Sequence, residues 1–161
     1  MNRSKLLYTI MLFLAAIWCV FIIAAPVLSS HQKIMSSGMI YYFFSNLCHQ
    51  IPERSFMLCE RQFAVCSRCT GIYSGFLIGV LLFPIIKIFK TNFQLSKKYF
   101  WIMLVPITLD VFISISGLWQ NTFTSRYFTG FILGSSIALL LVPGIYQYYE
   151  KMEGNHGFKT G

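Results

Sequence analysis

The stretch between residues 48 and 75 decides how this chain is organised. It reads Cys48-His49-Gln50-Ile51-Pro52-Glu53-Arg54-Ser55-Phe56 and, after the span 57–65, Cys66-Ser67-Arg68-Cys69-Thr70-Gly71-Ile72-Tyr73-Ser74-Gly75. Four of the five cysteines and one of the three histidines lie within it. Its second half runs directly into an apolar segment of helix length. Thiol and imidazole groups at such spacings are typical of metal ligation or of thiol-disulfide chemistry.

The composition of the whole chain is that of a membrane protein. Of the 161 residues, 56% are hydrophobic and only 11% are charged, whereas ordinary globular domains contain roughly 25% charged residues. The net charge of +8 comes from basic residues in short runs between apolar blocks, and topology signals of membrane proteins are placed in this way. A nucleic-acid binder would need a continuous basic surface. We therefore expect a lipid bilayer, and no nucleic acid, as a partner of this chain.

Four apolar segments predict an all-α, polytopic membrane protein that forms a single domain over residues 1–161. A bilayer core requires about 20 apolar residues per helix. The first segment also exceeds the roughly 7–15 residues of a signal-peptide core, which favours a retained helix over a cleaved signal. The expected transmembrane helices cover residues 6–28, 70–89, 99–118 and 126–148, and the Cys/His loop covers residues 29–69.

Within the loop, the aromatic segment 39–44 is too short to cross a bilayer. Tyrosine-rich segments favour the membrane-water interface, so this segment predicts either a short interfacial helix or a plain extended loop. Lysine and arginine set the expected orientation. With the N-terminus inside, eight basic residues lie on the inner side and five on the outer side. The positive-inside rule then predicts a multi-pass protein of the cell membrane with both termini cytoplasmic and the Cys/His loop extracytoplasmic.

Two of the expected helices carry small residues at every fourth position. Such stripes allow helix backbones to approach closely in lipid, so we expect segments 70–89 and 126–148 to pack through these faces. The pattern indicates either a duplicated helical hairpin or the ordinary similarity of glycine-rich membrane helices. The same stripes would also suit a homo-oligomer or a membrane partner. They consist of Gly71, Gly75 and Gly79 in one segment and of Gly130, Gly134 and Ala138 in the other.

Asp110 is the only acidic residue within the four apolar segments. A carboxylate in the bilayer costs about 2.5–3.5 kcal/mol unless it is paired or hydrated. We therefore expect Asp110 to face the helix bundle and to bond to Arg126, to Thr129, or to a substrate or ion. It either locks the third and fourth helices together or takes part in proton handling or ligand binding.

The cysteines admit three interpretations. In the first, Cys48, His49, Cys66 and Cys69 bind zinc or iron, because a Cys-x-x-Cys turn places two sulfurs on one ion, with Cys59 as an alternative ligand. In the second, Cys66 and Cys69 are redox-active thiols, since a helix N-terminus favours the thiolate. In the third, the cysteines form structural disulfides that pin the loop.

The motifs together resemble a known family. Cys-His-Gln at residues 48–50, Arg-Ser-Phe at 54–56 and Cys-Ser-Arg-Cys-Thr-Gly at 66–71 resemble small prokaryotic membrane proteins catalogued as a domain of unknown function. That pattern does not require a cysteine at position 59, which argues against Cys59 as a ligand. The resemblance assigns no reaction, so whether the protein is an enzyme stays open. It implies a site made from Cys48, His49, Arg54, Cys66, Arg68, Cys69, Asp110 and Arg126, with Arg54, Arg68, Asp110 and Arg126 as the catalytic candidates.

The sequence thus predicts an uncharacterised membrane protein with a zinc- or iron-binding Cys/His site at the membrane surface. Two other functions stay open. One is a membrane thiol-disulfide oxidoreductase that uses Cys66 and Cys69. The other is a small accessory subunit of a membrane complex.

Overall fold

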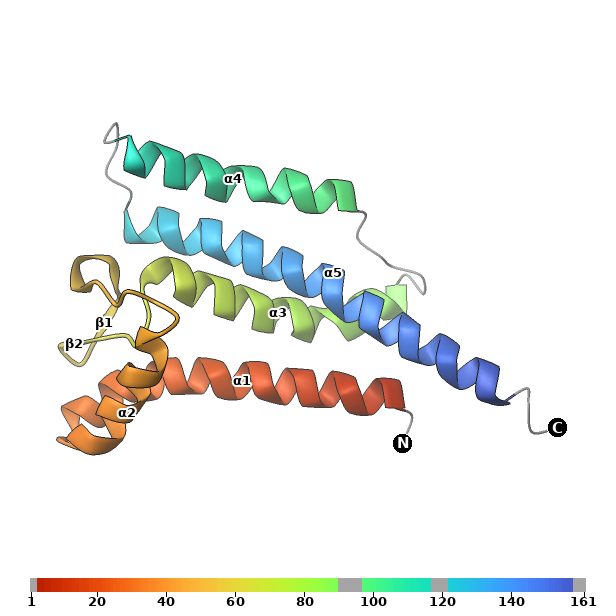
Figure 1. The fold of residues 1–161 in the computed structure, drawn as a ribbon, viewed down its shortest axis with the longest axis horizontal. Coiled ribbons are helices and arrows are strands. Elements are labelled where there is room, and N and C mark those ends of the chain that lie inside the picture. Colours follow the sequence, from red (N-terminus) through yellow and green to blue (C-terminus); the bar gives the residue numbers. More distant parts are fainter. Residues whose placement is uncertain (1–2, 90–96, 117–121, 158–161) are drawn as a thin grey trace.

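The computed structural model describes residues 3–89, 97–116 and 122–157, and it confirms the helical architecture (Figure 1). Because the segments are continuous and apolar, with few turn residues inside them, each forms one long helix. The five helices are α1 (Arg3–Ser30), α2 (Ile34–Ser45), α3 (Ser67–Phe89), α4 (Lys97–Ile115) and α5 (Phe123–Gly157), and the short elements between α2 and α3 are a 3₁₀ turn η1 (Pro52–Arg54) and the strands β1 (Met57–Leu58) and β2 (Arg61–Gln62).

Three helices of the described part of the chain, α1, α3 and α5, are long and apolar enough to cross a bilayer. The apolar part of α4 that the structure describes, Trp101–Ile115, is shorter, and the end of the expected third span (residues 117 and 118) lies outside the described residues. That α4 also spans the membrane therefore stays a prediction. The aromatic segment 39–44 does form a helix, and α2 extends it in both directions.

The helices lie side by side in the order α4, α5, α3 and α1 (Figure 1). The C-terminal end of α1, the whole of α2, both strands and the first turns of α3 and α5 gather at one end of the bundle. The beginning of α1 and the C-terminal half of α5 lie at the opposite end. Consequently the Cys/His loop and the start of the helix pair α3–α5 share one end of the molecule.

The predicted packing of α3 against α5 through their glycines is confirmed. A Cβ atom added to Gly71 would collide with the backbone carbonyl oxygen of Tyr127, and one added to Gly134 would collide with that of Ile72. The two backbones therefore touch where the side chains are missing, as small-residue stripes in membranes allow. These two faces contact each other within one chain. The expected contact of the same faces with a second copy or a membrane partner stays a prediction.

A small core fastens the loop to α1 and α2. Ala25 of α1, Phe44 of α2 and Val65 just before α3 are all buried against one another. The hydroxyl of Ser37 also donates a hydrogen bond of 3.0 Å to the carbonyl oxygen of Ala25. Burial of such apolar side chains contributes roughly 1.5–3 kcal/mol each, so the segment that leads into α3 is held in place by the rest of the loop.

The two strands form an antiparallel hairpin that sequence analysis did not predict. Its two-residue turn consists of Cys59 and Glu60, whose φ angles of 51° and 60° lie in the left-handed region. Tight hairpins of this kind need positive φ at both central residues, and neither residue belongs to the types that usually signal such a turn. Cys59 is exposed at the hairpin tip and lies outside the group formed by the other loop cysteines.

Candidate metal centre

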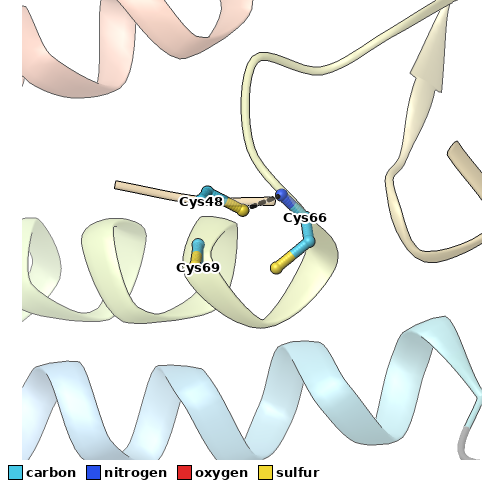
Figure 2. Close-up of side chains that lie close together, drawn as sticks. All are labelled: Cys48, Cys66 and Cys69. Atoms are coloured by element: carbon cyan, nitrogen blue, oxygen red, sulfur yellow. Dashed lines mark hydrogen bonds between the residues drawn. The ribbon is translucent and has the colours of Figure 1, made fainter. Parts of the chain in front are cut away.

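Three thiols meet where the loop joins α3. The sulfur atoms of Cys48, Cys66 and Cys69 all lie within 4.8 Å of one another (Figure 2). Cys48 is buried, and the other two are half-buried. Cys48 follows the C-terminus of α2, whereas Cys66 directly precedes α3 and Cys69 lies in its first turn. Two segments separated in the sequence therefore supply one cluster.

Backbone hydrogen bonds at the ends of α2 and α3 position these thiols. The Cys48 N–H donates to the carbonyl oxygen of Phe44 over 2.9 Å, which carries the chain through the last turn of α2. The carbonyl oxygen of Cys66 accepts bonds from the N–H and the hydroxyl of Thr70, so α3 begins at the Cys-x-x-Cys motif. The Cys66 N–H in turn donates to Cys48 Sγ over 3.2 Å (Figure 2). The sulfur of Cys48 is thus hydrogen-bonded to the backbone of Cys66, the residue that supplies the second thiol.

Gln50 holds the Cys48 segment against the segment before α3. Its Nε2 donates to the carbonyl oxygens of Tyr41 and Ala64, over 2.7 and 2.9 Å. Its backbone has a φ of 48°, a left-handed conformation that directs the chain away from the cluster directly after His49. The only signal for Gln50 in the sequence is its place beside the Cys-His pair, which does not indicate this role.

The Cys48 thiol is strongly acidic in this arrangement. Hydrogen bonds from the thiols of Cys66 and Cys69, together with those from the backbone of Cys66 and Gln50, lower the pKa of Cys48 far below its usual value. They do so because each bond stabilises the thiolate, and this outweighs the opposing effect of burial. The thiolate is the form that binds metals and attacks disulfides.

The comparisons with known proteins show which family the chain belongs to. Residues 48–140 match the family described as "Predicted membrane protein (DUF2085)". The chain belongs to this DUF2085 family. The matched region begins at Cys48 and contains every site residue that the sequence predicted. The expected resemblance to a membrane-protein family of unknown function is thereby confirmed.

Two archaeal proteins are similar to this DUF2085 protein. "Uncharacterized protein MJ1492" of Methanocaldococcus jannaschii is 34% identical over 113 residues, which cover 70% of this chain and 72% of that protein. An "Uncharacterized protein" of Methanothermobacter thermautotrophicus is 31% identical over 105 residues, covering 63% of this chain and 90% of that protein. No solved structure matches the chain.

Apart from Asp110, the remaining predicted site residues of the DUF2085 protein line a pocket that the three thiols also line. This pocket has a volume of about 390 Å³. His49 is exposed and its ring nitrogens do not belong to the sulfur group, although the residue lines the same pocket. Arg54 and Arg126 line it too, and Arg54 is exposed. The structure thus brings together three of the four predicted metal ligands and places the fourth at the rim.

Asp110 of α4 pairs with a residue of this pocket and connects three helices. The carboxylate is buried, forms an ion pair with Arg68 of α3, and accepts a hydrogen bond of 2.7 Å from the Ser125 hydroxyl of α5. We expected Asp110 to bond to Arg126, to Thr129, or to a substrate or ion. The ion pair that the structure shows is with Arg68. Ser125 also belongs to the site, although sequence analysis assigned it no role. A short polar residue at the start of α5 is its only signal.

Proposed function

We propose that this DUF2085 protein binds a transition metal, zinc or iron, through Cys48, Cys66 and Cys69 at one end of its helix bundle. The observation that carries the proposal is the mutual distance of the three sulfur atoms, at most 4.8 Å. Thiolates bound to one zinc ion at about 2.3 Å lie about 3.8 Å apart. Small rotations of the side chains would therefore close the cluster around an ion.

The chemistry of the donors supports zinc or iron. Thiolate ligands select zinc, iron-sulfur clusters or monovalent copper over magnesium or calcium. The low pKa of Cys48 favours the thiolate of this one residue, to which Cys66 and Cys69 donate hydrogen bonds. Because ligands must be deprotonated to bind, the binding of a metal would release the protons of these two thiols. Gln50, which ties the two ligand segments together, is the kind of outer residue that fixes metal ligands.

The number of ligands bears on what the metal does. Structural zinc sites are closed by four protein ligands, whereas catalytic sites keep one position open. The described residues supply three sulfurs, and the pocket lies beside them. His49 at the pocket rim would complete a structural site if its side chain turned inward. If a water molecule or a substrate takes that position, the site is suited to polarising a bound group.

We place this site on the extracytoplasmic side of the cell membrane, with α4 as a fourth span and both termini in the cytoplasm. The bias of basic residues supports this orientation. The arrangement of the helices is consistent with it, because the start of α1 and the C-terminal half of α5 lie at the end opposite the cysteine cluster (Figure 1). A reporter fused after Met35 would test it, and a cytoplasmic signal there would overturn the orientation.

Metal analysis of the purified full-length protein tests the proposal. We expect about one zinc or iron per chain in the wild type, and loss of that metal in Cys48→Ser and in Cys66→Ser/Cys69→Ser. Cys59→Ser is the matched control, because this exposed cysteine at the hairpin tip lies outside the sulfur group, and it should keep its metal. A His49→Ala variant that keeps its metal would indicate an open position, and one that loses it would indicate a closed site.

Two results would favour the other functions. A metal-free protein with a Cys66–Cys69 disulfide, reduced by a dithiol and reoxidised by a quinone that takes up the two electrons, would indicate thiol-disulfide oxidoreduction. The mutual proximity of the three sulfurs would also allow exchange with Cys48. Stability and metal content that are unchanged without the three cysteines would leave an accessory subunit as the remaining function.

A further inference from the structure

Three guanidinium groups surround the pocket beside the thiols. Arg54, Arg68 and Arg126 all line it. Arg68 is paired with Asp110, but among the described residues neither Arg54 nor Arg126 has a carboxylate within ion-pair distance. Three positive charges therefore face one carboxylate. A zinc ion held by three thiolates would carry one net negative charge, so the pocket would still hold an excess of positive charge.

A separate apolar groove shares the lining residue Ile72 with this pocket. It has a volume of about 450 Å³, and its walls come from α1, α3 and α5. Leu14 and Trp18 line one side, and Phe76 lines the other. Ile72 lines both the groove and the charged pocket. The two hollows therefore adjoin at Ile72, one turn below Arg68 on α3.

We propose that this pair of hollows binds an anionic amphiphile, with a phosphate-type oxyanion at Arg54 and Arg126 and one hydrocarbon chain in the groove. Guanidinium groups match phosphate oxygens with paired hydrogen bonds. The groove lies between helices that are apolar enough to span a bilayer, where the occupant at hand is a lipid chain. The proposal does not rest on the metal, because neither arginine nor the groove needs the thiols to be loaded.

Two sources of the oxyanion are distinguishable. An anionic phospholipid would use both the arginines and the groove, whereas a soluble phosphate compound would use the arginines alone. The shared residue Ile72 favours the phospholipid, because the groove proposed for its chain adjoins the pocket that contains the arginines. Basic groups near a membrane surface each strengthen the binding of anionic lipid.

Native mass spectrometry of the full-length protein in detergent tests this proposal, with phosphatidylglycerol, phosphatidylcholine and glycerol phosphate as probes. We expect tighter binding of phosphatidylglycerol than of phosphatidylcholine. Arg54→Gln/Arg126→Gln should weaken binding of phosphatidylglycerol by roughly 30-fold. Arg61→Gln is the matched control, because this exposed arginine lies in the same loop but outside the pocket.

The groove is tested by filling it. Leu14→Trp should weaken phosphatidylglycerol binding by roughly 10-fold, because the larger side chain occupies space that the lipid chain needs. Phe13→Trp is its control, since Phe13 is exposed on the same helix but does not line the groove. Wild-type protein treated with a chelator should bind phosphatidylglycerol as untreated protein does, which separates this proposal from the metal site.

Three kinds of result would overturn the inference. The first concerns the arginines: either the two lipids bind equally, or the arginine substitutions leave phosphatidylglycerol binding unchanged. The second is an equal effect of Leu14→Trp and Phe13→Trp. The third is glycerol phosphate binding as tightly as phosphatidylglycerol, because a soluble phosphate site would then suffice.

Discussion

Replacing Asp110 by asparagine tests how the site end of the bundle is held together. Asp110 is the residue of α4 that forms an ion pair with Arg68 of α3 and accepts a hydrogen bond from Ser125 of α5. Asparagine keeps the volume of the side chain and can still accept the Ser125 hydroxyl. The substitution removes the negative charge, so it abolishes the ion pair and turns the Ser125 hydrogen bond into one between neutral groups.

The expected cost follows from the burial of the two partners. Breaking a buried ion pair by removing one partner typically costs about 3–5 kcal/mol. The Asp110 side chain is 5% exposed and that of Arg68 is 25% exposed, and Arg68 lines the pocket, so water can partly solvate the unpaired guanidinium. We therefore expect Asp110→Asn to lower the free energy of unfolding by about 2–3 kcal/mol. Ser125→Ala, which removes one hydrogen bond to a charged group, should cost about 1.5 kcal/mol.

Reversible unfolding in mixed detergent micelles measures these free energies. Thr108→Val is the matched control, because Thr108 is exposed on the same helix and its hydroxyl bonds only within α4; it should change stability by less than about 0.5 kcal/mol. A double-mutant cycle with Arg68→Gln should give a coupling energy of about 2 kcal/mol. An Asp110→Asn protein as stable as Thr108→Val, or a coupling energy near zero, would refute the role of this ion pair.

Two further outcomes follow from the same structure. Gly134→Ala should lower the free energy of unfolding by about 2–3 kcal/mol because its new methyl group meets the backbone of Ile72, whereas Gly144→Ala, with open space around it, should be neutral or stabilising by up to about 1 kcal/mol in the same assay. Gln50→Leu should weaken metal binding by roughly 10-fold in competition with a chelator. Gln32→Leu, at an exposed position that also has a positive φ of 58°, should leave the metal affinity unchanged.

Much of the fold could be predicted from the sequence because lipid imposes strict rules on it. A bilayer requires long apolar helices. Small residues at every fourth position identified the faces of α3 and α5 that contact each other. Hydropathy marks where a membrane ends and not where a helix ends, so α5 continues to Gly157 beyond the expected limit at residue 148. The hairpin at residues 57–62 left no signal, because strands of two residues have no periodicity.

The site was predictable as a set of residues but not as a geometry. The Cys-x-x-Cys motif by itself predicts that the sulfur atoms of Cys66 and Cys69 lie close together, because the two residues are one helical turn apart. Which of the adjacent side chains Cys48 and His49 faces them depends on the turn after α2 and on the left-handed backbone at Gln50. The spacing of residues in the sequence predicts neither this turn nor the left-handed backbone at Gln50. The ion-pair partner of Asp110 is not predictable for a similar reason. Arg68 of α3 and Arg126 of α5 are both near the beginning of their helices, and the sequence does not show which of them pairs with the carboxylate.

The contact between α3 and α5 also fixes the chemistry of the site. A Cβ atom at Gly130 of α5 would collide with the backbone carbonyl oxygen of Arg68, the residue between the two thiols of the Cys-x-x-Cys motif. The backbone of the first turn of α3 therefore rests directly on α5, four residues beyond Arg126. Sliding α3 along α5 would move Cys69 and Arg68 together relative to Arg126 and would separate Arg68 from Asp110. Close helix packing and the position of the thiols are thus set by the same backbone contact, which explains how a site at a membrane surface can hold its geometry with few hydrogen bonds of its own.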